Sequence, residues 1–439
     1  MMNKKDIIKK ISSYIILFLI MVVVFSIAMI GTYLLPNERI RAHIAESKEL
    51  LINQNGNPLF TDYIKGANLD VFTDLLIMNT AMNKGKTEDE SVFIRAFENS
   101  RYNNEEDNSY TSLQETVENP DIHNNQEYSR YWHGIQTIIR PLLLFFNYEE
   151  IRYIFMLLIF VLLGISLLLI NKNISCMHSM AFLVSMLAVC IFIVPMSIQY
   201  SAIFIITLLA VIIVNLLHKK QKAKFIPYLF FIIGGLTTFF DLLTAPLLTL
   251  GIPLIIEVLL RSREESLSIK KAFLEIIKLS ILWAIAYGTI FFAKWVIASL
   301  IMQKDLITVA INQILFRTNG SEEYPATKIG AIVENFTYLY NNVLLACGIV
   351  TIIGWIIALI KTRKNKINWE KILILLIISI YPYVWYMVFA GHSTIHAFFT
   401  YRIQAIAIFG VLCIMLEFVD LKTKEKINKA GKEKQEGNE

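Results

Sequence analysis

The chain has 439 residues, of which 55% are hydrophobic and 18% are charged. Soluble domains carry about a quarter charged residues, and here the apolar residues form long blocks. The composition therefore excludes an ordinary soluble protein and indicates membrane spans. The net charge of +5 is carried mainly by short loops, where it reports membrane topology, so it does not indicate a nucleic-acid-binding surface.

The first apolar block, residues 12–35, follows a lysine-rich N-terminus. It is longer than the about 7–15 apolar residues of a cleaved signal peptide. No Ala-x-Ala cleavage site follows it. The block therefore predicts an uncleaved signal anchor.

A helix needs about 20 apolar residues to cross a bilayer. The sequence predicts ten such spans, at residues 12–35, 151–170, 179–198, 201–217, 225–241, 244–260, 272–298, 341–360, 371–390 and 403–420. With ten spans, every lysine and arginine cluster falls on one side, the cytoplasm, whereas nine or eleven spans would break this agreement. A bias toward Lys, Ile and Asn is typical of an AT-rich bacterial genome. We therefore expect a multi-pass protein of a bacterial plasma membrane with both termini in the cytoplasm.

The opposite side of the membrane then receives three loops, 36–150, 299–340 and 391–402. The first contains two stretches with helical spacing, 68–82 and 127–147. The second stretch is rich in aromatic residues and predicts an amphipathic helix at the membrane interface, kinked or restarted at Pro141. The polar middle, 84–126, is interpreted either as a flexible loop or as a lid over a substrate. The sequence therefore predicts four parts: the N-terminus with the first span (1–35), the loop with amphipathic helices (36–150), the multi-span bundle (151–420) and a basic cytoplasmic tail (421–439).

Unusual polar residues gather at the predicted outer ends of spans. Ionisable groups near apolar segments are costly, so they tend to face a cavity and mark function. Acids there could take a proton from an attacking hydroxyl, and cations could stabilise a departing phosphate. The candidate acids are Asp74 and Asp241, and the candidate substrate or phosphate contacts are Arg130, His133, Arg140, Lys294, His392, His396 and Arg402.

Each candidate also has a structural interpretation. Asp241 could cap the helix of the sixth span, and Asp74 could be an exposed residue of an amphipathic helix. Lys294 could reach toward the interface, and Arg402 could be an interface anchor. All of these interpretations stay open at this point.

The sequence predicts no cofactor and leaves a divalent metal open. His392 and His396 are four apart and could bind a metal if helical. However, no His-Glu-x-x-His pattern is present, so polar lining or phosphate contact is favoured. The phosphate-loop pattern Gly-x-x-x-x-Gly-Lys-Ser/Thr is also absent, which disfavours ATP-driven transport within this chain.

The layout of one span, a long outer loop and many further spans resembles the GT-C class of membrane glycosyltransferases. Three stretches resemble those of bacterial members found with cell-surface polysaccharide genes: 128–134 (YSRYWHG), 140–143 (RPLL) and 392–402 (HSTIHAFFTYR). The resemblance implies a GT-C helical bundle and a polyprenyl-phosphate sugar as donor. It also implies a key acid in the first outer loop, for which Asp74 is the match. Glu38 is a rival, because in many members the acid follows the first span almost at once.

The function expected from this resemblance is inverting glycosyl transfer onto a glycan or lipid-linked acceptor at the outer membrane face. Asp74 or Glu38 would act as the base, and Asp241 would orient the acceptor or serve as a second acid. Arg402, His392 and His396 would hold the phosphate, assisted by Arg130 or Lys294. The alternatives are a polysaccharide polymerase or ligase, a non-enzymatic lipid or solute carrier, and a scaffold for envelope assembly.

Overall fold

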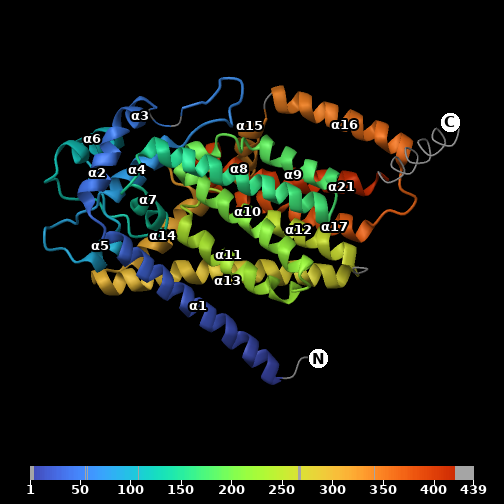
Figure 1. Cartoon of the computed structure of the whole chain (residues 1–439), viewed down its shortest axis with the longest axis horizontal. Coiled ribbons are helices and arrows are strands. Elements are labelled where there is room, and N and C mark those ends of the chain that lie inside the picture. The colour runs from blue at the N-terminus through green and yellow to red at the C-terminus, as the bar shows by residue number, and fades with distance from the viewer. Residues whose placement is uncertain are drawn as a thin grey trace, which may run out of the picture.

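The computed structural model describes residues 4–54, 56, 58–106, 108–264, 268–340 and 342–420. These residues form helices and connecting segments with isolated β-bridges, and no strand occurs among them. Figure 1 shows a bundle of long helices, with the segments between α1 (Lys4–Tyr33) and α8 (Tyr148–Asn173) gathered at one end. We call this the loop-domain end. The predicted tail, 421–439, lies outside the described residues.

Eight helical segments of the described chain are long and apolar enough to cross a membrane, as expected for an integral membrane α-helical protein. Each overlaps one of the predicted spans. They are α1, α8, α10 (Ile198–Lys219), η2 with α11 (Ala223–Phe225 and Ile226–Phe240), α13 (Ile269–Met302), α16 (Asn342–Thr362), α17 with α18 (Trp369–Ser379 and Tyr381–Val388), and α20, η3 and α21 together (Ala397–Thr400, Tyr401–Gln404 and Ala405–Glu417).

The predicted span at 179–198 is a shorter helix, α9 (Cys176–Ala188), followed by an irregular segment that contains η1 (Val194–Met196). α8 and α10 run in the same direction, because residues at the start of both donate to the Asp74 carboxylate. Toward their other ends, the Asn173 amide donates to Asn215 Oδ1 at 3.1 Å. The chain must therefore return along the bundle between them, and α9 with the η1 segment covers that path.

The predicted span at 244–260 is α12 (Leu248–Glu264), which follows a turn. The α12 segment runs beside α10 in the same direction. The Gln199 and Thr244 side chains are hydrogen-bonded at one end, and His218 Nε2 lies 2.6 Å from Glu257 Oε2 nearer the other. Both shorter helices thus connect the same two ends as the long ones. The count of ten crossings and the cytoplasmic position of both termini stay predictions.

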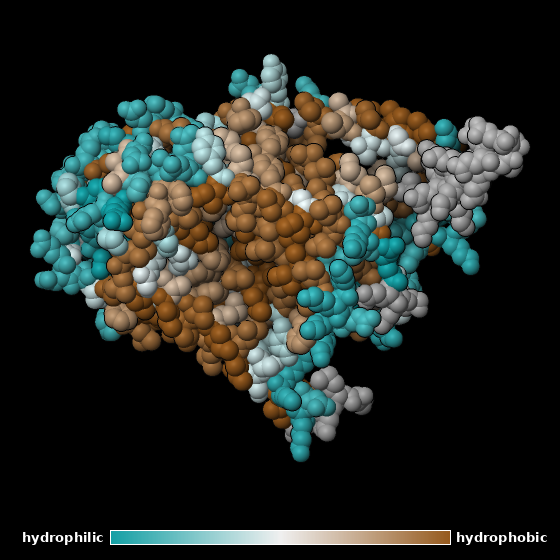
Figure 2. Space-filling model, in the orientation of Figure 1, coloured by the Kyte–Doolittle hydropathy of each residue, from teal (hydrophilic) through white to brown (hydrophobic). Residues whose placement is uncertain are grey.

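Apolar side chains cover the outside of the bundle. Figure 2 shows a broad hydrophobic band with hydrophilic atoms at the loop-domain end and around the opposite end. α16 has no buried residue among those described and stands apart from the bundle in Figure 1, although its Trp355 indole donates to the Met415 carbonyl of α21 (2.9 Å). Such a surface would be costly in water and suits a lipid environment.

The loop-domain end has its own apolar core, in which Ile77, Ile139 and Leu113 are fully buried. The core also includes Ile151 and Ile198 from the starts of α8 and α10, so the loop domain is packed onto the bundle. Its helices are α2 (Asn37–Glu46), α3 (Lys48–Asn53), α4 (Val71–Ala81), α5 (Val92–Glu98), α6 (Ser109–Glu118) and α7 (Gln136–Leu142).

The helix predicted from the spacing in 68–82 is confirmed as α4, which begins after the N-cap residue Asp70. The helix predicted over 127–147 is wrong for most of its length, because only α7 is helical and Pro141 lies inside its last turn. His133 interrupts the stretch with a φ of +55°. The Trp132 ring is buried and donates from Nε1 to the Ile290 carbonyl at 2.8 Å, so tertiary packing and not the membrane interface holds it.

The polar middle, 84–126, contains α5 and α6. Asn124 donates from Nδ2 to Asn83 Oδ1 (2.6 Å) and to the Ser100 carbonyl (2.8 Å), which ties its two ends together. This part of the loop is therefore a structured component of the domain. Its role as a lid stays a prediction.

Two further segments complete the loop-domain end. The predicted loop 299–340 contains α14 (Leu306–Asn319) and α15 (Lys328–Leu339), and the loop 391–402 contains α19 (Ala390–Ile395) and α20. α15 is joined to the second loop because Asn335 Nδ2 donates to the Ser393 carbonyl at 2.7 Å. These segments lie against the loop domain, where a polar cavity forms.

Candidate functional site

A cavity of about 310 Å³ lies between the loop domain, the end of α14 and the segment 392–399. Its wall mixes charged, polar and aromatic groups from distant parts of the chain. They include Asp70, Arg130, Gln199, Arg317, His392 and His396.

Asp70 lines the cavity and is the N-cap residue of α4. Its Oδ1 accepts from the Thr73 backbone N–H (3.0 Å), and its own N–H donates to Ser197 Oγ (2.9 Å). Its Oδ2 is buried and has no hydrogen-bond partner among the described residues. Burial raises the pKa of this carboxyl above its usual 3.8, against the opposing effects of the Thr73 contacts and of Arg402. An acid of this kind has a free lone pair and an increased affinity for a proton.

Three arginines line the same cavity, namely Arg101, Arg130 and Arg317. Arg130 and Arg317 each have a buried Nε without a hydrogen-bond partner in the described chain. Neither forms an ion pair with a described carboxylate. The Arg130 guanidinium lies over the Tyr128 and Tyr131 rings, at 5.0 and 5.5 Å from their centroids. Guanidinium groups arranged this way suit an anionic ligand, above all a phosphate.

The two histidines of the cavity are neutral hydrogen-bonding groups. Arg317 Nη1 donates to His392 Nδ1 at 2.8 Å, so the proton of His392 must be on Nε2, which lies 2.7 Å from the Leu243 carbonyl. Burial lowers the pKa of His396 to about 3 and the pKa of His392 well below its usual value. The positive charge of the cavity therefore comes from arginines, and His392 holds Arg317 in place.

An apolar groove of about 420 Å³ adjoins the polar cavity. It lies between α13 and α14 and is lined by aromatic rings, including Phe291, Phe292 and Trp295. Its wall shares three residues with the polar cavity, namely Arg130, Tyr131 and Arg317. A ligand with a polar head, an anionic linker and an apolar tail would match this sequence of surfaces.

The three acids predicted from the sequence lie elsewhere. Asp74 is fully buried, and its carboxylate accepts from Tyr148 Oη (2.7 Å) and from the backbone N–H groups of Ile198 and Gln199 (3.0 and 3.2 Å), which fixes the start of α10. Glu38 is exposed on α2. Asp241 does not line the cavity.

Asp241 ends α11 and caps the following turn. Its Oδ1 accepts from the Thr244 backbone N–H at 2.9 Å, while its buried Oδ2 has no hydrogen-bond partner among the described residues. Burial raises the pKa of this carboxyl to about 7. Thr244 is also hydrogen-bonded to Gln199, whose side chain does line the cavity. Asp241 thus supports the cavity wall from behind.

Four of the predicted substrate or phosphate contacts are hydrogen-bonded within the protein and do not line the cavity. Lys294 Nζ donates to the Phe97 carbonyl (2.5 Å), and His133 Nε2 lies 2.9 Å from the Tyr128 carbonyl. Arg402 donates to the Gly66, Asn68 and Phe398 carbonyls, and the first two of these precede Asp70. Arg140 donates to the carbonyls of Thr32, Leu35 and Ala81 and to the Asn37 side chain.

The hydrogen bonds of Arg140 indicate that this side chain stabilises the fold. We expect Arg140→Ala to lower the free energy of unfolding by about 3 kcal/mol or more, because each buried acceptor left unsatisfied costs about 1–3 kcal/mol. The measurement is the thermal unfolding midpoint of the purified protein in detergent. Arg39→Ala, which removes an exposed arginine of α2, is the control and should leave the midpoint unchanged. Equal midpoints for both variants would contradict the structural role.

Sequence reasoning missed Asp70, Arg317 and Gln199. Asp70 stands directly before the apolar helix 71–81, where an aspartate is a favoured N-cap, so the capping rule could have drawn attention to it. Arg317 lies in the predicted loop 299–340, and no local pattern distinguishes it from an interface anchor. Gln199 gives no signal in the sequence, because its place on the cavity wall depends on tertiary contacts alone.

Comparison with known proteins adds no family assignment. No protein-family model matches the chain, and neither the curated proteins nor the solved structures give a match.

Proposed function

We propose that the protein is a glycosyltransferase that uses a polyprenyl-phosphate sugar to modify a cell-surface glycan on the outer face of a bacterial membrane. The observation that carries this proposal is the junction of two cavities. A polar cavity with a buried acid meets an apolar groove at a wall that contains two arginines. A polyprenyl-phosphate sugar presents the same order of groups: a polar sugar, an anionic phosphate and an apolar chain.

In the proposed reaction Asp70 is the base. The acceptor hydroxyl oxygen forms a bond to the anomeric carbon, and the bond from that carbon to the phosphate oxygen breaks. The hydroxyl proton passes to Asp70 Oδ2, and the bonding electron pair leaves with the polyprenyl phosphate. Arg130 and Arg317 stabilise the charge that grows on the phosphate as the bond breaks. Their effect is large where low-dielectric walls surround the charge.

The residues behind the cavity act as positioning residues. Arg402 holds the backbone that leads to Asp70, and Asp74 holds the start of α10, from which Ser197 reaches the Asp70 N–H. The predicted role of Arg402 as a phosphate contact is therefore replaced in this proposal by a role in positioning the base. The predicted role of Asp74 as the base passes to Asp70.

The role of the apolar groove in binding the polyprenyl chain can be tested by a substitution that fills it. Gly288 lines the groove, and a Cβ built on it meets no other atom within 4 Å. We expect Gly288→Leu to leave the fold intact and to reduce modification of the surface glycan, because the side chain occupies space needed by the polyprenyl chain. Gly164→Leu is the matched control, since Gly164 in α8 is equally unobstructed but lies outside both cavities. Glycan staining and mass spectrometry of cells that carry each variant provide the measurement.

If Gly164→Leu reduced glycan modification as much as Gly288→Leu, at equal amounts of inserted protein, the effect would come from leucine in a helix and not from filling the groove. Unchanged modification with Gly288→Leu would remove the groove from the proposal.

The pH dependence follows from the raised pKa of Asp70. A base must be ionised, so the rate should fall as the pH falls through the pKa of this carboxyl. Because burial raises that pKa above 3.8, we expect the acidic limb of the pH–rate profile to lie above pH 4. The profile can be measured as discharge of the donor lipid in proteoliposomes. A rate that stays constant down to pH 4 would contradict the assignment of Asp70.

A further inference from the structure

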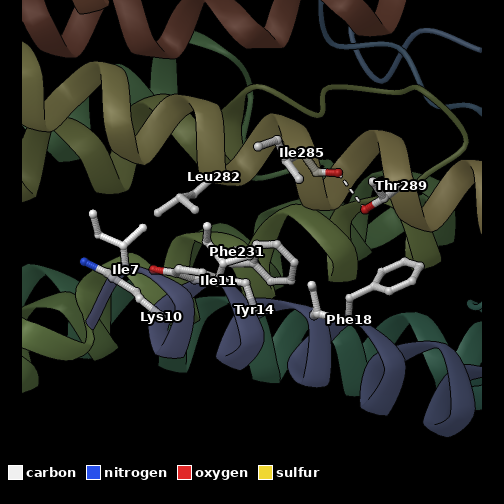
Figure 3. Close-up of a pocket in the computed structure, with 10 residues that line it drawn as sticks. Ile7, Lys10, Ile11, Tyr14, Phe18, Phe231, Leu282, Ile285 and Thr289 are labelled. Atoms are coloured by element: carbon white, nitrogen blue, oxygen red, sulfur yellow. Dashed lines mark hydrogen bonds between the residues drawn. The ribbon is translucent and has the colours of Figure 1, made fainter. Parts of the chain in front are cut away.

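A second apolar groove, of about 540 Å³, lies toward the other end of the bundle between α1, α11 and α13. α1 contributes one helical face, in which Ile7, Ile11, Tyr14 and Phe18 recur at intervals of three or four residues. Figure 3 shows these side chains facing Leu282 and Ile285 across the groove. In Figure 1, α1 diverges from α13 toward its N-terminus, and the residues of α1 that line the groove lie in this N-terminal part.

The groove has one charged lining residue, Lys10. No described ion pair includes it. The Tyr14 hydroxyl is buried without a hydrogen-bond partner in the described chain, and Figure 3 shows it at the same end of the groove as the Lys10 amino group. Lys10 stands immediately before the predicted span 12–35, so it lies where a headgroup region would meet the hydrocarbon core.

We propose that this groove binds one anionic phospholipid, independently of the reaction at the loop-domain end. An acyl chain would occupy the apolar space, and the phosphate would pair with Lys10 and accept a hydrogen bond from Tyr14. A protein partner is disfavoured because the groove offers one charge and almost no other polar group. Basic sites at helix ends attract anionic lipid headgroups, with a contribution of about 1 kcal/mol for each basic residue.

The test is native mass spectrometry of the full chain released from nanodiscs that contain equal amounts of phosphatidylglycerol and phosphatidylcholine. We expect the wild type to retain one phosphatidylglycerol in preference to phosphatidylcholine. Lys10→Gln should weaken phosphatidylglycerol binding about fivefold, the equivalent of about 1 kcal/mol, and should leave phosphatidylcholine binding unchanged.

A second pair of variants separates the groove from the rest of the α1 surface. Ile11 and Ile16 are 56% and 57% exposed, but of the two only Ile11 lines the groove. We expect Ile11→Trp to abolish the retained lipid and Ile16→Trp to keep it. Equal retention of both lipids by the wild type, or of phosphatidylglycerol by both tryptophan variants, would overturn the proposal. Binding of a phosphatidylglycerol molecule that depends on Lys10 would stand even if no glycosyl transfer were found.

Discussion

Replacing Asp70 by asparagine is expected to reduce glycosyl transfer by about 10²–10⁴-fold, the usual contribution of a positioned acid or base. Asparagine is as good an N-cap as aspartate, so α4 should still begin at Val71 and the protein should insert normally. The measurement is the modified fraction of the surface glycan in cells in which the variant replaces the wild-type gene. Unused polyprenyl-phosphate sugar should accumulate in their lipid extracts, and its mass identifies the sugar.

Two other acids of the same loop act as controls for this result. Asp62→Asn removes an exposed carboxylate and should have no effect. Asp74→Asn should lower stability, because the new amide cannot accept all three hydrogen bonds at the start of α10. If Asp74→Asn abolishes transfer at unchanged stability while Asp70→Asn remains active, the sequence-based choice of base is right and the present assignment is wrong.

The membrane-spanning part of the fold could be predicted from sequence because hydrocarbon imposes a simple rule. A crossing helix must satisfy its own backbone and expose apolar side chains over about 20 residues. α8 and α13 follow this rule, and their positions agree with the predicted spans at 151–170 and 272–298. The rule describes α9 and α12 less well, because α9 is shorter than a full span and continues as an irregular segment, and α12 begins only after a turn.

The loop domain was harder to predict, because tertiary contacts determine its local structure. The requirement for a long apolar helix, which hydrocarbon imposes on a span, does not apply to it. The spacing in 127–147 suggested a helix. However, Trp132 packs in one buried cluster with residues of α1, α11 and α13, and the chain turns at His133. The same limit applies to the site. Asp74 and Arg140 looked functional because they are charged residues in apolar surroundings, but their charges are matched by internal donors and acceptors.

Hydrogen bonds and location together separate two kinds of buried charge. A buried ionic group is costly unless its donors or acceptors are matched. Arg140 and Arg402 donate to backbone carbonyls from several elements, and their role is to connect those elements. Arg130, Arg317 and Arg402 each keep a buried Nε without a partner in the described chain, but only Arg130 and Arg317 line the cavity. The unmatched Oδ2 belongs to Asp70, which lines the same cavity. A substrate that completes these unmatched groups would recover part of their desolvation cost.

The contribution of the phosphate group to lipid binding is the second large effect that we expect. We expect the purified wild type to bind undecaprenyl phosphate more tightly than undecaprenol, which lacks the charge. Arg317→Gln should weaken binding of undecaprenyl phosphate about 10- to 100-fold, since a hydrogen bond to a charged group contributes about 1.5–3 kcal/mol. Binding of undecaprenol should be unchanged. Titration of each lipid into the nanodisc-embedded protein, followed by tryptophan fluorescence, gives both affinities.

A double-mutant cycle tells whether the two arginines act on one phosphate. If Arg130 and Arg317 contact the same group, the loss in Arg130→Gln/Arg317→Gln should differ from the sum of the single losses, because neighbouring charges couple. Arg317→Lys should restore only part of the affinity, since lysine lacks the planar fork that binds two oxygens at once. Arg39→Gln, on the exposed surface of α2, controls for net charge. Equal affinity of the wild type for both lipids would show that the junction of the two cavities does not recognise a phosphate. That result would contradict a polyprenyl-phosphate sugar as the donor.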